Sequence, residues 1–248
     1  MTQELQSTAG SVGTPYMPEF SVFSKLEAIY EEIAHALNGL SYDSIYFPHI
    51  VSVALLNNCL EAALAMVFLS RAPTDGGHPV LLRTLLESTA RLMFLARSPE
   101  DNALILERID CTEILRQIGK SANQGEPEET AVIRKIITDR LAVLNAEKIR
   151  KVSFKDILAE IKSTSLYPIY QTLSGVTHGQ ITPLLQQGFV EEPTTSSKFK
   201  ILRRLPEEKR QGFQEMAIGL LQLARLNMQR IFRHYPDAQP GSRGDAPR

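Results

Sequence analysis

Apolar residues recur along most of this chain at intervals of three and four, which places them on one face of an α-helix. Leu26, Tyr30 and Ile33 show this pattern near the start, and similar runs continue to about residue 234. Alternation of apolar and polar residues, which is typical of a half-buried strand, is almost absent. We expect residues 189–203 to form a long loop, in which a weak pairing between Val190 and residues 199–202 is the alternative.

Proline, glycine and capping patterns mark the ends of the predicted helices. Pro79 suits the first turn of a helix, and Ser98 and Ser153 each begin a capping-box pattern. The predicted helices cover residues 20–40, 46–71, 79–96, 99–120 and 128–147, a short segment from 154, and residues 167–178 and 206–234. We therefore predict an all-α fold, a single helical bundle of about seven to eight helices.

Two predicted helices carry more apolar residues than one buried face needs. The segment 46–71 is apolar nearly all round, so we expect it at the centre of the bundle. The last helix, 206–234, is predicted to pack centrally, with a homodimer seam as the alternative. Glu61 interrupts the longest apolar stretch, so we expect no membrane span.

The two ends of the chain have a different composition. Residues 1–18 are rich in Ser, Thr, Gly and Pro, and residues 236–248 are rich in Pro and Gly, which predicts a disordered arm and tail around one domain at residues 19–235. The arm lacks the basic start and apolar segment of a secretory signal. Cys59 and Cys111, the only cysteines, fit buried free thiols in a reducing, cytoplasmic setting.

The charge balance limits the classes of partner. With 27 basic and 28 acidic residues, the chain has no overall field that would attract nucleic acid or an anionic membrane. No spacing of metal-ligating residues and no phosphate loop is present, so we expect no cofactor and no metal. A local basic cleft that takes RNA or a small anionic ligand is compatible with this balance.

Polar residues form a stripe on each of two predicted helices. Arg83, Glu87 and Arg91 stand four residues apart within a strongly apolar segment, so they share one face. On the seventh predicted helix Tyr170, Ser174 and His178 show the same spacing. His178 stands in the last turn, where the helix dipole favours imidazolium, and an imidazole suits general acid–base catalysis near neutral pH. For the first stripe, the alternatives are a solvated helix face or an internal ion pair that sets the helix register. For His178, the alternative is a structural histidine that hydrogen-bonds another helix.

The two stripes are chemically complementary. Glu87 could orient the His178 ring or accept a hydrogen bond from Tyr170, while Arg83 and Arg91 could hold an anion. We therefore expect His178, Glu87 and Arg83 to be catalytic, and Arg91, Tyr170 and Ser174 to bind the substrate. A single sequence does not show whether the two helices face each other.

The stripe residues carry a resemblance to a family. Arg83-Thr-Leu-Leu-Glu87, followed by Met93-Phe-Leu95 and later by Tyr170-Gln-Thr-Leu-Ser174-Gly-Val-Thr-His178-Gly179, resembles a family of uncharacterised bacterial helical proteins. The resemblance spans residues 47–179 and implies a site at Arg83, Glu87, Tyr170, Ser174 and His178.

More loosely, the chain is similar to HEPN domains, helical bundles that include RNases of toxin–antitoxin and phage-defence systems. Those RNases carry an arginine, four to six residues and then a histidine on one helix. This chain departs from that pattern, because Gln171, Thr172 and Leu173 occupy the places where the arginine would stand before His178. The departure argues against direct transfer of RNase chemistry.

Three functions stay open at this point. The chain could be a HEPN-like nuclease of a toxin or phage-defence system, with His178 moving a proton. It could instead bind an anion or small molecule without catalysis. As a structural or partner-binding bundle, it would use the stripes as a buried polar network, and Arg83→Ala would then cost roughly 3–5 kcal/mol.

Overall fold

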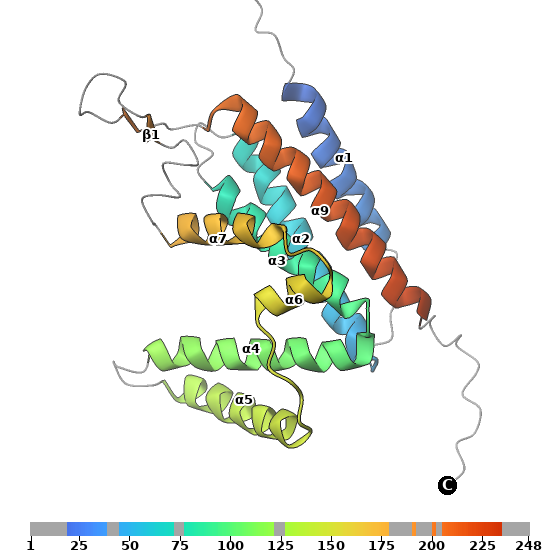
Figure 1. Ribbon diagram of the computed structural model, residues 1–248, viewed down its shortest axis with the longest axis vertical. Coiled ribbons are helices and arrows are strands. Elements are labelled where there is room, and N and C mark those ends of the chain that lie inside the picture. Colours follow the sequence, from blue (N-terminus) through green and yellow to red (C-terminus); the bar gives the residue numbers. More distant parts are fainter. Residues whose placement is uncertain are drawn as a thin grey trace, which may run out of the picture.

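The chain is helical nearly throughout the residues that its structure, a computed structural model, describes: 19–38, 45–71, 77–121, 127–178, 190–191, 200–201 and 205–234 (Figure 1). The helices are α1 (Glu19–Asn38), α2 (Phe47–Arg71), α3 (His78–Leu95), α4 (Pro99–Ser121), α5 (Glu128–Ala146), α6 (Phe154–Glu160), α7 (Leu166–Thr177) and α9 (Glu207–His234). Two strands, β1 (Val190–Glu191) and β2 (Lys200–Ile201), form one antiparallel pair. The all-α prediction is confirmed.

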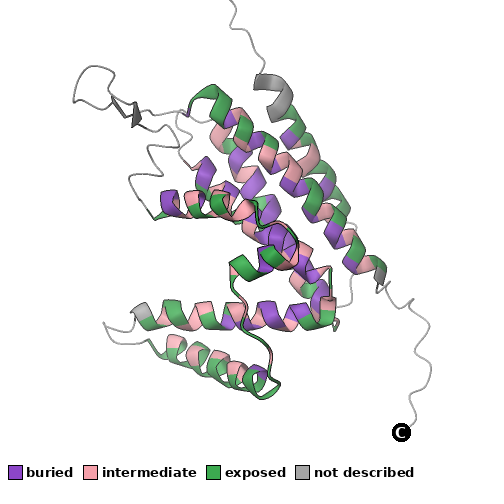
Figure 2. Cartoon of the chain, in the orientation of Figure 1, coloured by how far each residue is buried: buried purple, intermediate pink, exposed green. Residues whose placement is uncertain are grey.

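Helices α2, α3 and α9 pack against one another and hold most of the core. Helix α1 lies against α9 and α2, and buried residues run along the whole of α2 (Figure 2). The largest fully buried side chains include Phe94, Met66, Leu86 and Leu26. The sequence-based prediction that the second and last helices pack centrally therefore holds, because both bury apolar surface against several neighbours.

Helices α4 and α5 pair with each other beside this core. Helix α4 contacts α2 and α3, whereas α5 packs mainly on α4 and buries only Leu144 among its residues (Figures 1 and 2). On the other side of the α5–α6 connection, α6 and α7 pack on α3. This arrangement brings α7, which carries the second polar stripe, onto the helix that carries the first.

Local sequence signals place the helix ends well. The observed bounds agree with the predicted ones to within about two residues, the scatter expected at helix termini. At α6 the capping box is confirmed: the Asp156 amide donates to Ser153 Oγ at 3.3 Å, and the Ser153 amide donates to Asp156 Oδ2 at 2.9 Å. The weak strand pairing is also confirmed, with Val190 opposite Ile201.

The predicted disordered arm (1–18) and tail (236–248) lie outside the described residues. By length and composition α2 is apolar enough to cross a membrane, so Glu61 does not rule out such a segment. Half of the most apolar window of α2 is buried inside the bundle, as is common for the core helix of a globular protein.

Candidate functional site at the α3–α7 seam

The polar stripe of α3 is half-buried. The side chains of Arg83 and Glu87 are each 25% exposed, and that of Arg91 is 21% exposed. Their neighbours Leu82, Leu86 and Leu92 are fully buried, so the stripe lies at the edge of the apolar core. Its charges are therefore screened less than those of a solvated helix face.

Glu87 stands between the two arginines of this stripe. Arg91 Nη2 donates to Glu87 Oε1 at 2.9 Å, while Arg83 Nη2 lies 3.8 Å from Glu87 Oε2. Arg91 also donates through Nη1 to Asp110 Oδ1 of α4 at 3.0 Å. Arg91 is thus paired with two carboxylates and ties α3 to α4, whereas among the described residues Arg83 has only the more distant carboxylate of Glu87.

The two stripes meet at Arg83 and Tyr170, and this contact defines the seam between α3 and α7. Arg83 Nη2 donates a hydrogen bond to the Tyr170 hydroxyl at 3.4 Å, and its guanidinium carbon lies 5.4 Å from the centre of the tyrosine ring. The other side of this contact is supported by Phe154 of α6, whose ring centre is 4.2 Å from that of Tyr170. Helices α3, α6 and α7 therefore position Tyr170 together.

Arg83, Glu87, Arg91, Asp110 and Tyr170 form one polar cluster. The far end of the second stripe is separate from this cluster. Eight residues of helix place His178 about 12 Å along the axis from Tyr170. The His178 side chain is exposed, and Ser174 is half-buried on the turn before it. Within the described part of the chain neither side chain forms a hydrogen bond or ion pair with α3, and the bonds of Glu87 go to arginines. A role for Glu87 in orienting His178 stays a prediction.

Unmet hydrogen-bond donors remain in the cluster. The Nε atoms of Arg83 and Arg91 are both buried and have no partner among the described residues. For Arg91 the strong pairing of its other nitrogens compensates the charge. Arg83 has one hydrogen bond of 3.4 Å and one ion pair of 3.8 Å, so most of the donors of its guanidinium are unused by the described residues.

The α4 end of the cluster borders a cavity of about 590 Å³ between α2, α4 and α5. Arg91 and Asp110 lie at its edge together with the ion pair between Arg140 and Glu107, so its charges are balanced. Most of its lining is apolar, including Phe47, Val51, Leu55, Leu106 and Ile136. Its composition fits an uncharged apolar group better than an anion.

Asp110 is the residue that the sequence pattern did not indicate. It stands on a different helix from Arg91 and nineteen positions away, and no spacing rule links positions so placed. Its role in the cluster depends on how α4 crosses α3.

Comparison with known proteins places the chain in an uncharacterised group. The model of DUF5677, described as a family of unknown function, matches residues 49–194. The match covers more than half of the chain and contains both polar stripes. No curated protein and no solved structure matches.

Proposed function

Because the chain belongs to DUF5677, a family of unknown function, we propose its function from the geometry of the seam: it binds a small anionic ligand, with Arg83 as the principal cation. Phosphate is the favoured anionic group, since it can accept several donors from one guanidinium and from a neighbouring hydroxyl. Tyr170 supplies that hydroxyl. Nucleotides and short RNA are the corresponding classes of ligand.

The observation that carries this proposal is the difference between Arg83 and Arg91. Both guanidinium groups are about equally exposed, yet only Arg91 has carboxylate oxygens within 3.0 Å. A partly buried cation with a buried, unpaired Nε donor is a costly arrangement in an empty site. An anion bound beside Arg83 would supply both the acceptor and the opposite charge.

A screen of protein melting against anions tests the proposal. Inorganic phosphate, AMP, ATP and a short RNA oligonucleotide would each be added to the wild-type chain and to Arg83→Gln. Arg116→Gln is the matched control, because Arg116 is an exposed arginine paired with Glu113 on α4. We expect at least one anion to raise the melting temperature of wild type and control but not of Arg83→Gln. Equal shifts in all three proteins, or none with any anion, contradict the proposal.

A HEPN-like nuclease is the second candidate, and the exposure of His178 favours it. The ring lies at the end of α7, free of intramolecular hydrogen bonds among the described residues, and is accessible to a substrate. His178 lies about 12 Å along the helix from Tyr170. One phosphate could therefore not contact both Tyr170 and His178, whereas an extended RNA could. In this mechanism Arg83 would hold the backbone and His178 would transfer a proton.

RNA cleavage by purified protein tests the nuclease candidate directly. His178→Ala is expected to abolish cleavage and leave the melting temperature unchanged, since the side chain is exposed. His35→Ala, an exposed histidine on α1, is the control and should cleave normally. Binding of RNA without cleavage by the wild type would leave only the binding function. A toxin or phage-defence role stays a proposal that rests on this activity. The cytoplasmic location and a homodimer stay proposals that rest on the sequence alone.

A further inference from the structure

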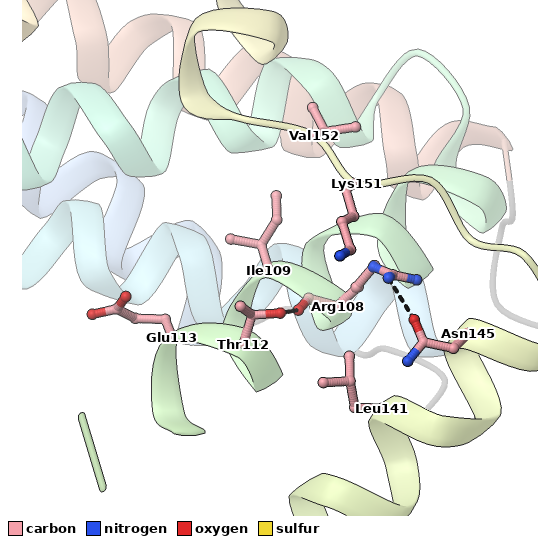
Figure 3. Close-up of a pocket in the computed structure, with 8 residues that line it drawn as sticks. All are labelled: Arg108, Ile109, Thr112, Glu113, Leu141, Asn145, Lys151 and Val152. Carbon is pink, nitrogen blue, oxygen red and sulfur yellow. Dashed lines mark hydrogen bonds between the residues drawn. The ribbon is translucent and has the colours of Figure 1, made fainter. Parts of the chain in front are cut away.

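A second pocket, away from the α3–α7 seam, lies between α4, α5 and the segment that follows α5 (Figure 3). Its volume is about 380 Å³, within the range of small-molecule sites. Figure 3 shows the Lys151 amine and the Arg108 guanidinium pointing toward the same space. The pocket is lined by Arg108, Ile109, Thr112, Glu113, Leu141, Asn145, Lys151 and Val152.

Arg108 is a buried cation without a carboxylate partner. The residue is only 6% exposed, and its guanidinium donates to the Ile149 carbonyl at 2.6 Å and to the Asn145 side-chain oxygen. Both acceptors are neutral, and no described carboxylate forms an ion pair with Arg108. A buried charge whose only partners are neutral is unfavourable unless an opposite charge can approach.

The charges around Arg108 do not neutralise it. Lys151 adds a second positive charge at the mouth of the pocket and has no ion pair within the described ranges. Glu113 is the one acidic residue in the lining, but it points away from both cations (Figure 3). Its carboxylate accepts from Arg116 Nε at 2.7 Å and from Gln117 Nε2 at 2.9 Å. The pocket therefore presents two cations that face a shared empty volume.

We propose that this pocket binds a small amphiphilic anion, a carboxylate or phosphate head on an apolar body. Arg108 and Lys151 hold the head, and the amide of Asn145 and the hydroxyl of Thr112 are the neighbouring polar groups. Ile109, Leu141 and Val152 form the apolar wall that receives the body. The site shares no residue with the seam, so it is independent of the function proposed above.

Titration of the ¹⁵N-labelled full chain by NMR tests the proposal with four probes: hexanoate, hexyl phosphate, hexan-1-ol and inorganic phosphate. Hexanoate or hexyl phosphate is expected to shift the amides of Thr112, Asn145 and Lys151 saturably. Hexanol lacks the head and inorganic phosphate lacks the body, so each should bind at least about tenfold more weakly. The better of the two amphiphiles identifies the head group as carboxylate or phosphate.

Variants separate this site from general charge effects. Lys151→Gln should weaken binding by about tenfold, whereas Lys135→Gln, an exposed lysine on α5, should leave it unchanged. Arg108→Gln, which removes the buried cation, should also weaken binding. Leu141→Phe, which fills the space beside the apolar wall, should weaken binding too, and it tests the site if Arg108→Gln fails to fold. Arg83→Gln should show the same shifts of the Thr112, Asn145 and Lys151 amides as the wild type, because Arg83 does not line this pocket, so failure here and failure at the seam are distinguishable. Absence of saturable shifts with both amphiphiles, or undiminished binding by Lys151→Gln, overturns the proposal.

Discussion

Arg83 Nη2 donates a 3.4 Å hydrogen bond to the hydroxyl of Tyr170, and the guanidinium lies over the ring of the same tyrosine. This contact links residues 87 positions apart and is the point where the two polar stripes join. At this length the hydrogen bond is weak. A stronger acceptor beside Arg83 would therefore replace this hydrogen bond at little cost, while Phe154 keeps the ring of Tyr170 in place.

Tyr170→Phe is predicted to destabilise the protein only slightly, by at most about 1 kcal/mol. The variant loses a long hydrogen bond but keeps the ring that contacts Phe154 and the Arg83 guanidinium. Tyr170→Leu should cost more, because it also removes these aromatic contacts. Urea denaturation of the three proteins measures the difference. Equal costs for Phe and Leu would show that the hydroxyl, and not the ring, carries the stability.

Arg83→Ala is predicted to cost about 1 kcal/mol, well below the roughly 3–5 kcal/mol expected when a buried ion pair loses one partner. The reason is that Glu87 keeps Arg91 at 2.9 Å, so no carboxylate is left without a cation. The free energies of unfolding of Arg83→Ala and the wild type, measured in urea, test this prediction. A loss above about 3 kcal/mol would favour the purely structural network over a ligand site.

Arg91→Ala should be the more damaging substitution of the two arginines. It removes the close partner of both Glu87 and Asp110 and the only tie between α3 and α4 in this cluster. Asp110 is 59% exposed and can be solvated, so most of the loss should come from Glu87. Parallel unfolding curves of the two alanine variants test this order; a reversed order would place the principal ion pair at Arg83.

The two cysteine thiols are predicted to be unreactive in the native protein. Burial raises the pKa of Cys59 to about 12, despite the opposing effect of a hydrogen bond with Thr89, and burial likewise raises the pKa of Cys111. Both thiols stay protonated at pH 8, and the thiolate is the reactive form. Ellman's reagent should therefore react slowly with the native chain. In guanidinium chloride, where the chain is unfolded, it should react with both thiols. Rapid native labelling that Cys111→Ser abolishes would show that Cys111 is accessible.

Stability should fall in acid partly through α6. The hydrogen bonds from Arg150 lower the pKa of Glu160 below its ordinary value of 4.5, and those from Ser153 lower the pKa of Asp156 below 3.8. Both carboxyls bind more protons in the unfolded chain, so their stabilisation is present above these ordinary values. It is lost as the pH falls through the lower folded pKa values.

Urea midpoints between pH 3 and pH 7 measure this loss. Glu160→Gln should flatten the acid decline and lower stability at pH 7, because the group can no longer titrate or pair with Arg150. Glu61→Gln, on the exposed side of α2, is the matched control and should keep the wild-type slope. A wild-type slope in Glu160→Gln would mean that other carboxyls dominate the acid transition.

The sequence by itself determined the helices and their polar faces. Helical periodicity and capping are local properties, so the ends of α3 and the capping box at Ser153 could be read directly. The four-residue spacing likewise placed Arg83, Glu87 and Arg91 on one face, which their ion pairs confirm.

Only the tertiary structure decided which of these faces meet. Helix crossing depends on how side chains of separate helices interlock, and no spacing within one helix contains that information. Packing brought Arg83 to Tyr170, gave Arg91 the unforeseen partner Asp110, and turned Glu87 toward arginines. It also buried Arg108 in a pocket shared with Lys151, forty-three positions away, which single-helix patterns could not indicate.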